Sequence, residues 1–204
     1  MGKHTKARVA VLVSGGGTNL QAILDAQAAG KITSGEIVLV VSNKEDAHAL
    51  ERAKKAGVPS KVLTRAACGG RKAVETQLMA LLDEEEIDLI VLAGFLSILG
   101  ERFTSHYPRR IINVHPALIP SFCGEGFYGL KVHEAALAKG VKVTGATVHF
   151  VNEIPDGGEI ILQKAVNVHP GDTPEKLQLR VMKQAEWKIL PAAVELISQE
   201  IIKA

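Results

Sequence analysis

The chain has 204 residues, of which 47% are hydrophobic and 23% charged, a composition that excludes a disordered or collagen-like chain. Its 24 Lys and Arg residues against 22 Asp and Glu give a formal charge of +2, which argues against a nucleic-acid-binding protein. The chain contains no apolar run of about 18 residues, so we expect no membrane span. Two cysteines are too few for a disulfide framework. We therefore expect a cytoplasmic protein with a single domain over residues 1–204.

The first part of the chain alternates short β-branched runs with longer stretches of helical periodicity. This alternation predicts strands and helices in turn, with strands at residues 8–14, 36–42, 61–63, 88–93 and 110–115, and helices at residues 18–29, 47–56, 71–86 and about 98–105. Such an order indicates an α/β fold with a single doubly wound, mostly parallel sheet and a Rossmann-like N-terminal half.

The alternation of predicted strands and helices ends after residue 140. Residues 143–151 and 159–168 are predicted as strands of an antiparallel hairpin at the far side of the sheet, joined by a turn at Asp156-Gly157-Gly158. Residues 173–199 are predicted to form one long C-terminal helix, with Asp172 or Thr173 as its N-cap. Pro191 should kink or break this helix, because proline removes a backbone donor.

A glycine turn, Ser14-Gly15-Gly16-Gly17-Thr18-Asn19, stands between the first strand and the first helix. Backbone N–H groups at such a helix N-terminus can bind an anion. The turn is not a dinucleotide fingerprint, because Leu20 occupies a required glycine position, and no Gly-Lys-Ser/Thr follows as in a P-loop. The pattern favours a single phosphate, and a tight turn without ligand is the alternative.

Asn113 and His115 lie two residues apart at the end of a predicted strand, so their side chains point to the same side. That end belongs to the carboxyl edge of the sheet, where open α/β folds bind ligands. An amide can donate to a developing oxyanion while an imidazole moves a proton, a combination suited to acyl transfer. The alternative is a pair of capped polar groups. Asp156 would matter if the fold brought it to His115, where a carboxylate raises the imidazole pKa.

The remaining histidines and the cysteines show no comparable pattern. For five histidines we expect surface or structural roles: His48, His106, His133, His149 and His169. No pair has metal-ligand spacing with an acid nearby, so we expect no metal.

Five segments together resemble the phosphoribosylglycinamide formyltransferases, folate-dependent enzymes of purine synthesis. They are VAVLVSGGGTNLQAI at 9–23, VVSNKEDAHALERAKKAGVP at 40–59, DLIVLAGFLSIL at 88–99, IINVHPALIPSF at 111–122 and TGATVHFVNEIPDGGEIILQ at 144–163. The Asn-x-His-Pro segment, followed by His-Phe-Val and Asp-Gly-Gly, is typical of formyltetrahydrofolate enzymes. The Ser-Gly-x-Gly-Thr-Asn opening is typical of members that bind a phosphorylated ribose.

The resemblance implies transfer of a formyl group from 10-formyltetrahydrofolate, as co-substrate, to the amine of 5'-phosphoribosylglycinamide. The products would be formylglycinamide ribotide and tetrahydrofolate. It assigns the catalytic roles to Asn113, His115 and Asp156. The partners would be these small molecules, with no nucleic acid or membrane, and the protein would be a monomer or homodimer.

The same resemblance assigns the binding residues. Those for the ribotide are Gly17, Thr18, Asn19, Lys183 and Glu186, and those for the folate are Arg71, Leu96, Ser97, Ile98, Leu99 and Asn113. The closing helix carries one residue more than the pattern of the family, which affects the match at Lys183 and Glu186. The segment 123–133 departs from the family's Pro-Gly pattern, and Cys123 within it is expected to be a bystander.

Three alternatives differ in the class of protein. A formyltetrahydrofolate deformylase uses the same Asn, His and Asp with water as acceptor, but carries an N-terminal regulatory domain of roughly a hundred residues. A methionyl-tRNA formyltransferase needs a C-terminal RNA-binding domain. A non-catalytic nucleotide-binding module would not need all three catalytic residues. The predicted strand at residue 8 and the charge of +2 therefore favour the small-molecule transferase.

Overall fold

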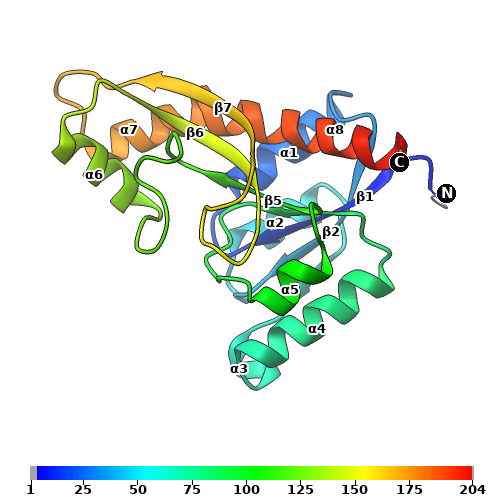
Figure 1. Ribbon diagram of the computed structural model, residues 1–204. Helices are drawn as coiled ribbons and strands as arrows, with labels where there is room; N and C mark the ends of the chain where they lie inside the picture. The colour runs from blue at the N-terminus through cyan, green and yellow to red at the C-terminus, as the bar shows by residue number, and fades with distance from the viewer. Residues whose placement is uncertain (1–3, 204) are drawn as a thin grey trace.

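A computed structural model describes residues 4–203, and one seven-stranded sheet organises them (Figure 1). The strand order is β3-β2-β1-β4-β5-β6-β7. The strands are β1 Ala7–Val13, β2 Gly35–Ser42, β3 Ser60–Val62, β4 Leu89–Leu92, β5 Ile111–His115, β6 Val143–Phe150 and β7 Ile160–Asn167. The ends of the predicted domain, residues 1 and 204, lie outside the described residues.

The direction of strand pairing divides the sheet into two parts. Strands β3, β2, β1, β4 and β5 pair in parallel, whereas β5 with β6 and β6 with β7 pair antiparallel. The predicted fold class is thus confirmed: an α/β fold with a mostly parallel sheet, and an antiparallel hairpin at one edge.

Helices cover both faces of the sheet (Figure 1). They are α1 Thr18–Ala28, α2 His48–Lys55, α3 Arg65–Cys68, α4 Arg71–Glu84, α5 Glu101–His106, α6 Leu130–Lys139, α7 Pro174–Val181, the π-helix η1 Met182–Glu186 and α8 Trp187–Lys203. Strand β1 shows why both faces are covered: Val9 and Val11 belong to the core under α1 and α8, while Ala10 and Leu12 belong to the core under α4 and α5. A parallel strand buried on both faces is therefore continuously apolar.

The C-terminal helix differs from its prediction. Thr173 is the N-cap, since its Oγ1 accepts from the Lys176 N–H at 3.3 Å, but the helix is interrupted at η1. Helix α8 runs through Pro191, so the predicted break at that residue is wrong. The irregularity lies before Pro191, in η1, where a π-turn holds one residue more than a regular helical turn. The closing helix is also the element for which the resemblance to the family implied one extra residue.

Two smaller differences separate the predicted helices from the observed ones. The four-residue helix α3 was not predicted, and its N-cap is Thr64, whose Oγ1 accepts from the Ala67 N–H at 3.1 Å. The predicted helix at about 98–105 begins only at Glu101, because residues 93–100 form an irregular segment. Of the helices in residues 4–203, none has the length and hydropathy required to span a membrane.

Candidate active site

A cleft of about 850 Å³ opens where β4 and β5 end. Its walls come from the segments 94–98, 113–116, 124–129 and 155–156, and from Asn19, Lys131, His133, Gln178, Met182 and Glu186. The cleft therefore lies at the carboxyl edge of the parallel strands, where ligands of open α/β folds bind. We call it the catalytic cleft.

Asn113, His115 and Asp156 meet in the catalytic cleft, and we call them the catalytic cluster. Asn113 and His115 lie on β5, and Asp156 follows β6. His115 Nδ1 lies 3.3 Å from Asp156 Oδ2, with the two side chains 4% and 14% exposed. The structure thus brings Asp156 to Asn113 and His115, which lie much earlier in the sequence.

The turn that carries Asp156 is tightly constrained. Asp156 has a positive φ of 54°, and a Cβ on Gly158 would lie 1.7 Å from the carbonyl oxygen of Phe150, so only glycine fits there. The Gly124 N–H donates to Asp156 Oδ2 at 2.9 Å. Burial opposes ionisation of Asp156, but the imidazoles of His149 and His115 and the Gly124 N–H bring its pKa below the usual range. Asp156 is therefore a carboxylate at neutral pH.

The His115 ring lies between two acceptors. Its Nδ1 faces Asp156, and its Nε2 donates to the Phe122 carbonyl oxygen at 2.8 Å. Burial lowers the pKa of His115, while Asp156 and the Phe122 carbonyl raise it by less. The carboxylate acts in the predicted direction, but burial is the larger effect, so the net pKa shift is downward. The lowered pKa keeps the ring neutral, the form that can accept a proton, and the adjacent carboxylate stabilises the cation that forms.

His149 belongs to this site, although the sequence suggested only a surface or structural role. It is the antiparallel partner of Asn113 in the β5–β6 pairing and is 1% exposed. Its Nε2 lies 3.3 Å from Asn113 Nδ2 and 3.4 Å from Asp156 Oδ1. The strand register, which alternation alone does not give, reveals this pairing, and His149 is also the histidine of the His-Phe-Val motif.

His133 lines the catalytic cleft from α6. It is fully buried, and within residues 4–203 neither ring nitrogen has a hydrogen-bond partner. Burial and then the nearby His115 lower its pKa to about 4. His133 is therefore neutral at physiological pH.

The glycine loop, residues 14–19, leads into α1. Gly17 has a φ of 69°, and a Cβ on it would lie 2.6 Å from the Ala49 Cβ, so the close packing of the loop on α2 requires glycine. No side chain caps α1, and its first turn carries no acidic residue. The Arg52 Nε donates to the Gly16 carbonyl oxygen at 2.8 Å, which holds a cation beside the loop. Free N–H groups, the helix dipole and this guanidinium together favour an anion.

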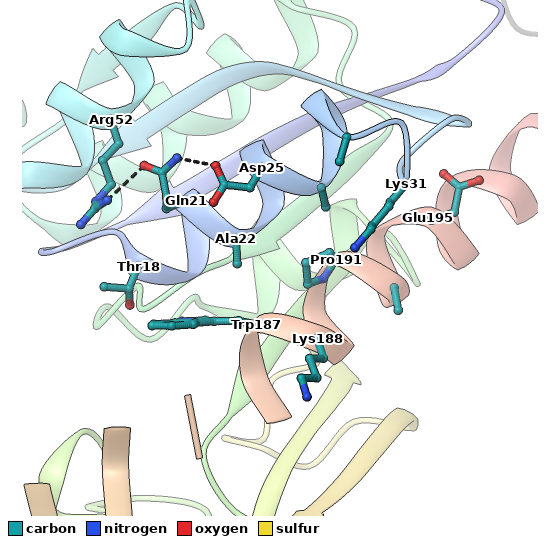
Figure 2. A pocket seen from close by; sticks show the side chains of 13 residues that line it. Thr18, Gln21, Ala22, Asp25, Lys31, Arg52, Trp187, Lys188, Pro191 and Glu195 are labelled. Atoms are coloured by element: carbon teal, nitrogen blue, oxygen red, sulfur yellow. Dashed lines mark hydrogen bonds between the residues drawn. The ribbon is translucent and has the colours of Figure 1, made fainter. Parts of the chain in front are cut away.

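The loop lies between two hollows. Asn19 lines the catalytic cleft, whereas Thr18 lines a second groove of about 830 Å³ between α1 and α8. Figure 2 shows Thr18 beside Trp187 at one end of this groove, and a hydrogen-bonded row of Arg52, Gln21 and Asp25 along α1.

Glu186 links the glycine loop to the closing helix. The Asn19 Nδ2 donates to Glu186 Oε2 at 2.7 Å, and both side chains are buried. Burial raises the pKa of Glu186 to about 7, although the hydrogen bond from Asn19 lowers it. Lys183 is exposed and does not line the catalytic cleft, where Met182 lies instead. The structure therefore brings Glu186, but not Lys183, to the other predicted residues.

The predicted folate residues divide between two hollows. Leu96, Ser97 and Ile98 line the catalytic cleft, and Leu96 and Ile98 are 62% and 54% exposed. Leu99 is buried and lines a smaller hollow of about 230 Å³, together with Arg71. Ser97 and Ile98 line both hollows, so Arg71 lies next to the catalytic cleft rather than in it.

The atypical segment 123–133 forms one wall of the cleft. Gly124, Gly126 and Gly129 have positive φ, and Tyr128 and Lys131 line the cleft, with Lys131 Nζ donating to Tyr128 Oη at 3.1 Å. Cys123 lies beside this wall, and burial and then Asp156 raise the pKa of its thiol. A protonated thiol is a weak nucleophile.

Within residues 4–203, no group of three or more His, Cys, Asp or Glu side chains is arranged to hold a metal ion.

Comparison with known proteins identifies a family. The family model described as formyl transferase matches residues 7–194. A phosphoribosylglycinamide formyltransferase of Escherichia coli (strain K12) is 42% identical over 186 residues, covering 91% of this chain and 84% of that protein. A trifunctional purine biosynthetic protein adenosine-3 of Bos taurus is 44% identical over 198 residues, covering 97% of this chain. The chain spans 19% of the length of that trifunctional relative.

Solved structures agree with this result. The crystal structure of glycinamide ribonucleotide transformylase 1 from Symbiobacterium toebii superimposes with a TM-score of 0.89 at 41% identity, covering 97% of this chain and 90% of that one.

Proposed function

This chain belongs to the formyl transferase family, among the phosphoribosylglycinamide formyltransferases, and we propose that it formylates the amine of 5'-phosphoribosylglycinamide in purine biosynthesis. The formyl donor is 10-formyltetrahydrofolate, and tetrahydrofolate and formylglycinamide ribotide are the products. The observation that carries the proposal is the meeting of Asn113, His115 and Asp156 in one cleft that Asn19 and Glu186 also line.

The chemistry is an acyl transfer in two steps. The ribotide amine attacks the formyl carbon, and the carbonyl oxygen becomes an oxyanion that accepts a hydrogen bond from the Asn113 amide. His115 takes the proton that the amine loses, and Asp156 stabilises the imidazolium at 3.3 Å. The imidazolium then protonates the folate nitrogen N10, whose bond to the formyl carbon breaks. The imidazole is thereby restored to its starting state.

The two substrates occupy opposite ends of the cleft in this proposal. The phosphate of the ribotide binds the N–H groups of Gly17, Thr18 and Asn19, where α1 has no capping side chain. Glu186 contacts the ribotide next to Asn19, whose Nδ2 donates a hydrogen bond to Glu186. The exposed apolar side chains of Leu96 and Ile98 offer a surface for the folate ring, with Ser97, Leu99 and Arg71 beside them.

One assay tests the proposal. The chain is supplied with 10-formyltetrahydrofolate, with and without 5'-phosphoribosylglycinamide, and the deformylated folate is followed by absorbance. We expect turnover only when the ribotide is present. Equal turnover without it would mean a hydrolase, and no turnover in either case would mean a binding module.

We also propose that the protein works in the cytoplasm as a monomer or homodimer, folded as one domain and without a metal. The mechanism supports the last point, since His115 and Asp156 supply the proton transfer. A chelator should leave kcat unchanged, light scattering should give a mass of one or two chains, and urea unfolding should show a single transition.

A further inference from the structure

A hollow beside the catalytic cleft gathers basic side chains that the proposed chemistry does not use. It has a volume of about 230 Å³ and shares lining residues with the cleft in the segment 95–98. Lys44, Arg65 and Arg71 line it, and Glu75 is the acidic side chain among its lining residues. With three basic side chains and one acidic one, the hollow has an excess of two positive charges. We call it the basic hollow.

Two of the three cations of the basic hollow have no partner. Arg71 Nε donates to Glu75 Oε1 at 3.1 Å, and the same oxygen accepts from the Gly100 N–H at 3.1 Å. Among residues 4–203, by contrast, the side chains of Lys44 and Arg65 make no hydrogen bond or ion pair, and both residues are exposed. Their positive charges are therefore available to an anionic ligand.

The proposed formyl donor carries its negative charge on its tail. In 10-formyltetrahydrofolate, N10 joins the pterin ring system to a benzoyl group, and a glutamate follows, to which further glutamates can be linked through their γ-carboxyl groups. Each added glutamate brings one further carboxylate, which is ionised at neutral pH because glutamate carboxyls have pKa values of about 4. Since N10 has to lie at His115 for the reaction, this tail has to leave the catalytic cleft along one of its walls.

The distribution of charge distinguishes these walls. Of the Lys and Arg residues in 4–203, Lys131 is the one that lines the catalytic cleft, and its Nζ already donates to Tyr128 Oη at 3.1 Å. The wall at 124–129 also carries the acidic Glu125. Beyond the segment 95–98, in contrast, lie the two unpartnered cations of the basic hollow. Because opposite charges attract, an anionic tail is favoured on that side.

We propose that Lys44 and Arg65 bind the γ-linked glutamates that follow the first glutamate of the folate, so that the preferred donor of this chain is a folylpolyglutamate. Arg71, which the resemblance assigns to the folate, is paired with Glu75 and is not needed for these further carboxylates. Lysine and arginine side chains are long and flexible, which suits a tail of variable length. The inference rests on the proposed function, because it takes a folate to lie along the segment 95–98.

Calorimetric titration with tetrahydrofolate carrying either one or three glutamates tests the proposal, because it requires no turnover. An exposed ion pair strengthens binding by roughly 1.5- to fivefold. With two such pairs, we expect the wild-type chain to bind the triglutamate about three- to tenfold more tightly than the monoglutamate. In Lys44→Gln/Arg65→Gln this preference should fall below about twofold. Raising the ionic strength to about 1 M should also reduce it in the wild type, because charges are then screened beyond about 3 Å.

Lys54→Gln/Lys55→Gln is the matched control. These two lysines are exposed on α2 and line neither the catalytic cleft nor the basic hollow, so the variant removes the same net charge elsewhere and should keep the preference for the triglutamate. Equal affinities of the wild type for the two folates, an unchanged preference in Lys44→Gln/Arg65→Gln, or an equal loss in the control would overturn the proposal. A preference for the triglutamate without ribotide-dependent turnover would instead refute the proposed function, and binding of neither folate would refute both.

Discussion

The glycine loop, whose Asn19 lines the catalytic cleft, and the catalytic cluster within that cleft differ in physical character. The loop is open: at Gly15 and Gly16 an added Cβ would meet no atom within 4 Å, and the groups it offers are backbone N–H donors. The cluster is closed: His115 is 4% exposed and has an acceptor at each ring nitrogen. Backbone donors cannot titrate, so the loop suits binding, whereas buried ionisable groups change charge during a reaction and suit catalysis. Substitutions in the loop should therefore affect mainly binding, and substitutions in the cluster mainly kcat.

The largest effect is expected in the cluster. His115→Ala and Asp156→Asn should each lower kcat, by about 10³-fold for His115→Ala and somewhat less for Asp156→Asn, because proton transfer alone contributes about 10²–10⁴. Ribotide binding should stay within about threefold of wild type, because the loop is intact. Stopped-flow turnover and calorimetric titration of the ribotide measure the two quantities. Near-normal turnover in either variant would remove that residue from the mechanism.

The next largest effect is expected in the loop. Gly17→Ala places a Cβ 2.6 Å from the Ala49 Cβ at a φ of 69°. Overpacking and the left-handed conformation should together cost roughly 2–4 kcal/mol and weaken ribotide binding more than tenfold. Gly15→Ala is the control, since its Cβ would meet open space. Urea unfolding of both variants checks the difference, and equal stabilities would show that the loop tolerates side chains throughout.

Glu186, which links the closing helix to the glycine loop through Asn19, should make stability depend on pH. Its pKa is raised from an ordinary 4.5 to about 7, so the folded chain keeps this proton up to a higher pH than the unfolded chain does. Stability contributed by Glu186 is present below about pH 4.5 and is lost as pH rises through about 7. Glu186→Gln should therefore be more stable than wild type by roughly 3 kcal/mol at pH 8, and by only about 1 kcal/mol at pH 5. Unfolding at the two pH values measures this, and a pH-independent difference would contradict it.

The smallest effect is expected at Arg52. Arg52→Gln loses the hydrogen bonds to the Gly16 carbonyl at 2.8 Å and to Gln21 Oε1 at 3.0 Å, and removes a cation beside the phosphate site. The ribotide KM should rise about three- to tenfold with kcat unchanged, and stability should fall by about 1 kcal/mol or less. Lys54→Gln, an exposed change on the same helix, serves as the control. A drop in kcat at Arg52 would mean that the loop also takes part in catalysis.

The sequence predicts the loop better than it predicts the cluster, because the loop is local. Six consecutive residues and the helix that follows determine its geometry. Asn113 and His115 are also readable from one strand, but the position of Asp156 depends on the β5–β6 pairing and on a turn that only glycine at position 158 allows. His149 was expected to have a surface or structural role, although it belongs to the His-Phe-Val motif, because alternation marks a strand but not the residue opposite it.

The closing helix shows a second limit of sequence patterns. The resemblance to the family assigned both Lys183 and Glu186 to the ribotide, and the structure brings only Glu186 to Asn19. A π-turn changes the angle between successive residues, so a face calculated for a regular α-helix is wrong inside η1. Met182, and not Lys183, lines the catalytic cleft.

The π-turn also bears on how this element can change in evolution. In a regular helix an inserted residue rotates everything after it by about 100°, which would turn the apolar face of α8 away from α1. Here the five residues of η1 form a π-turn, which holds one residue more than an α-helical turn, and the buried positions of α8, such as Leu190 and Val194, lie in the core. We therefore expect a one-residue change in the length of the closing helix to be accommodated at η1 more easily than elsewhere in this helix.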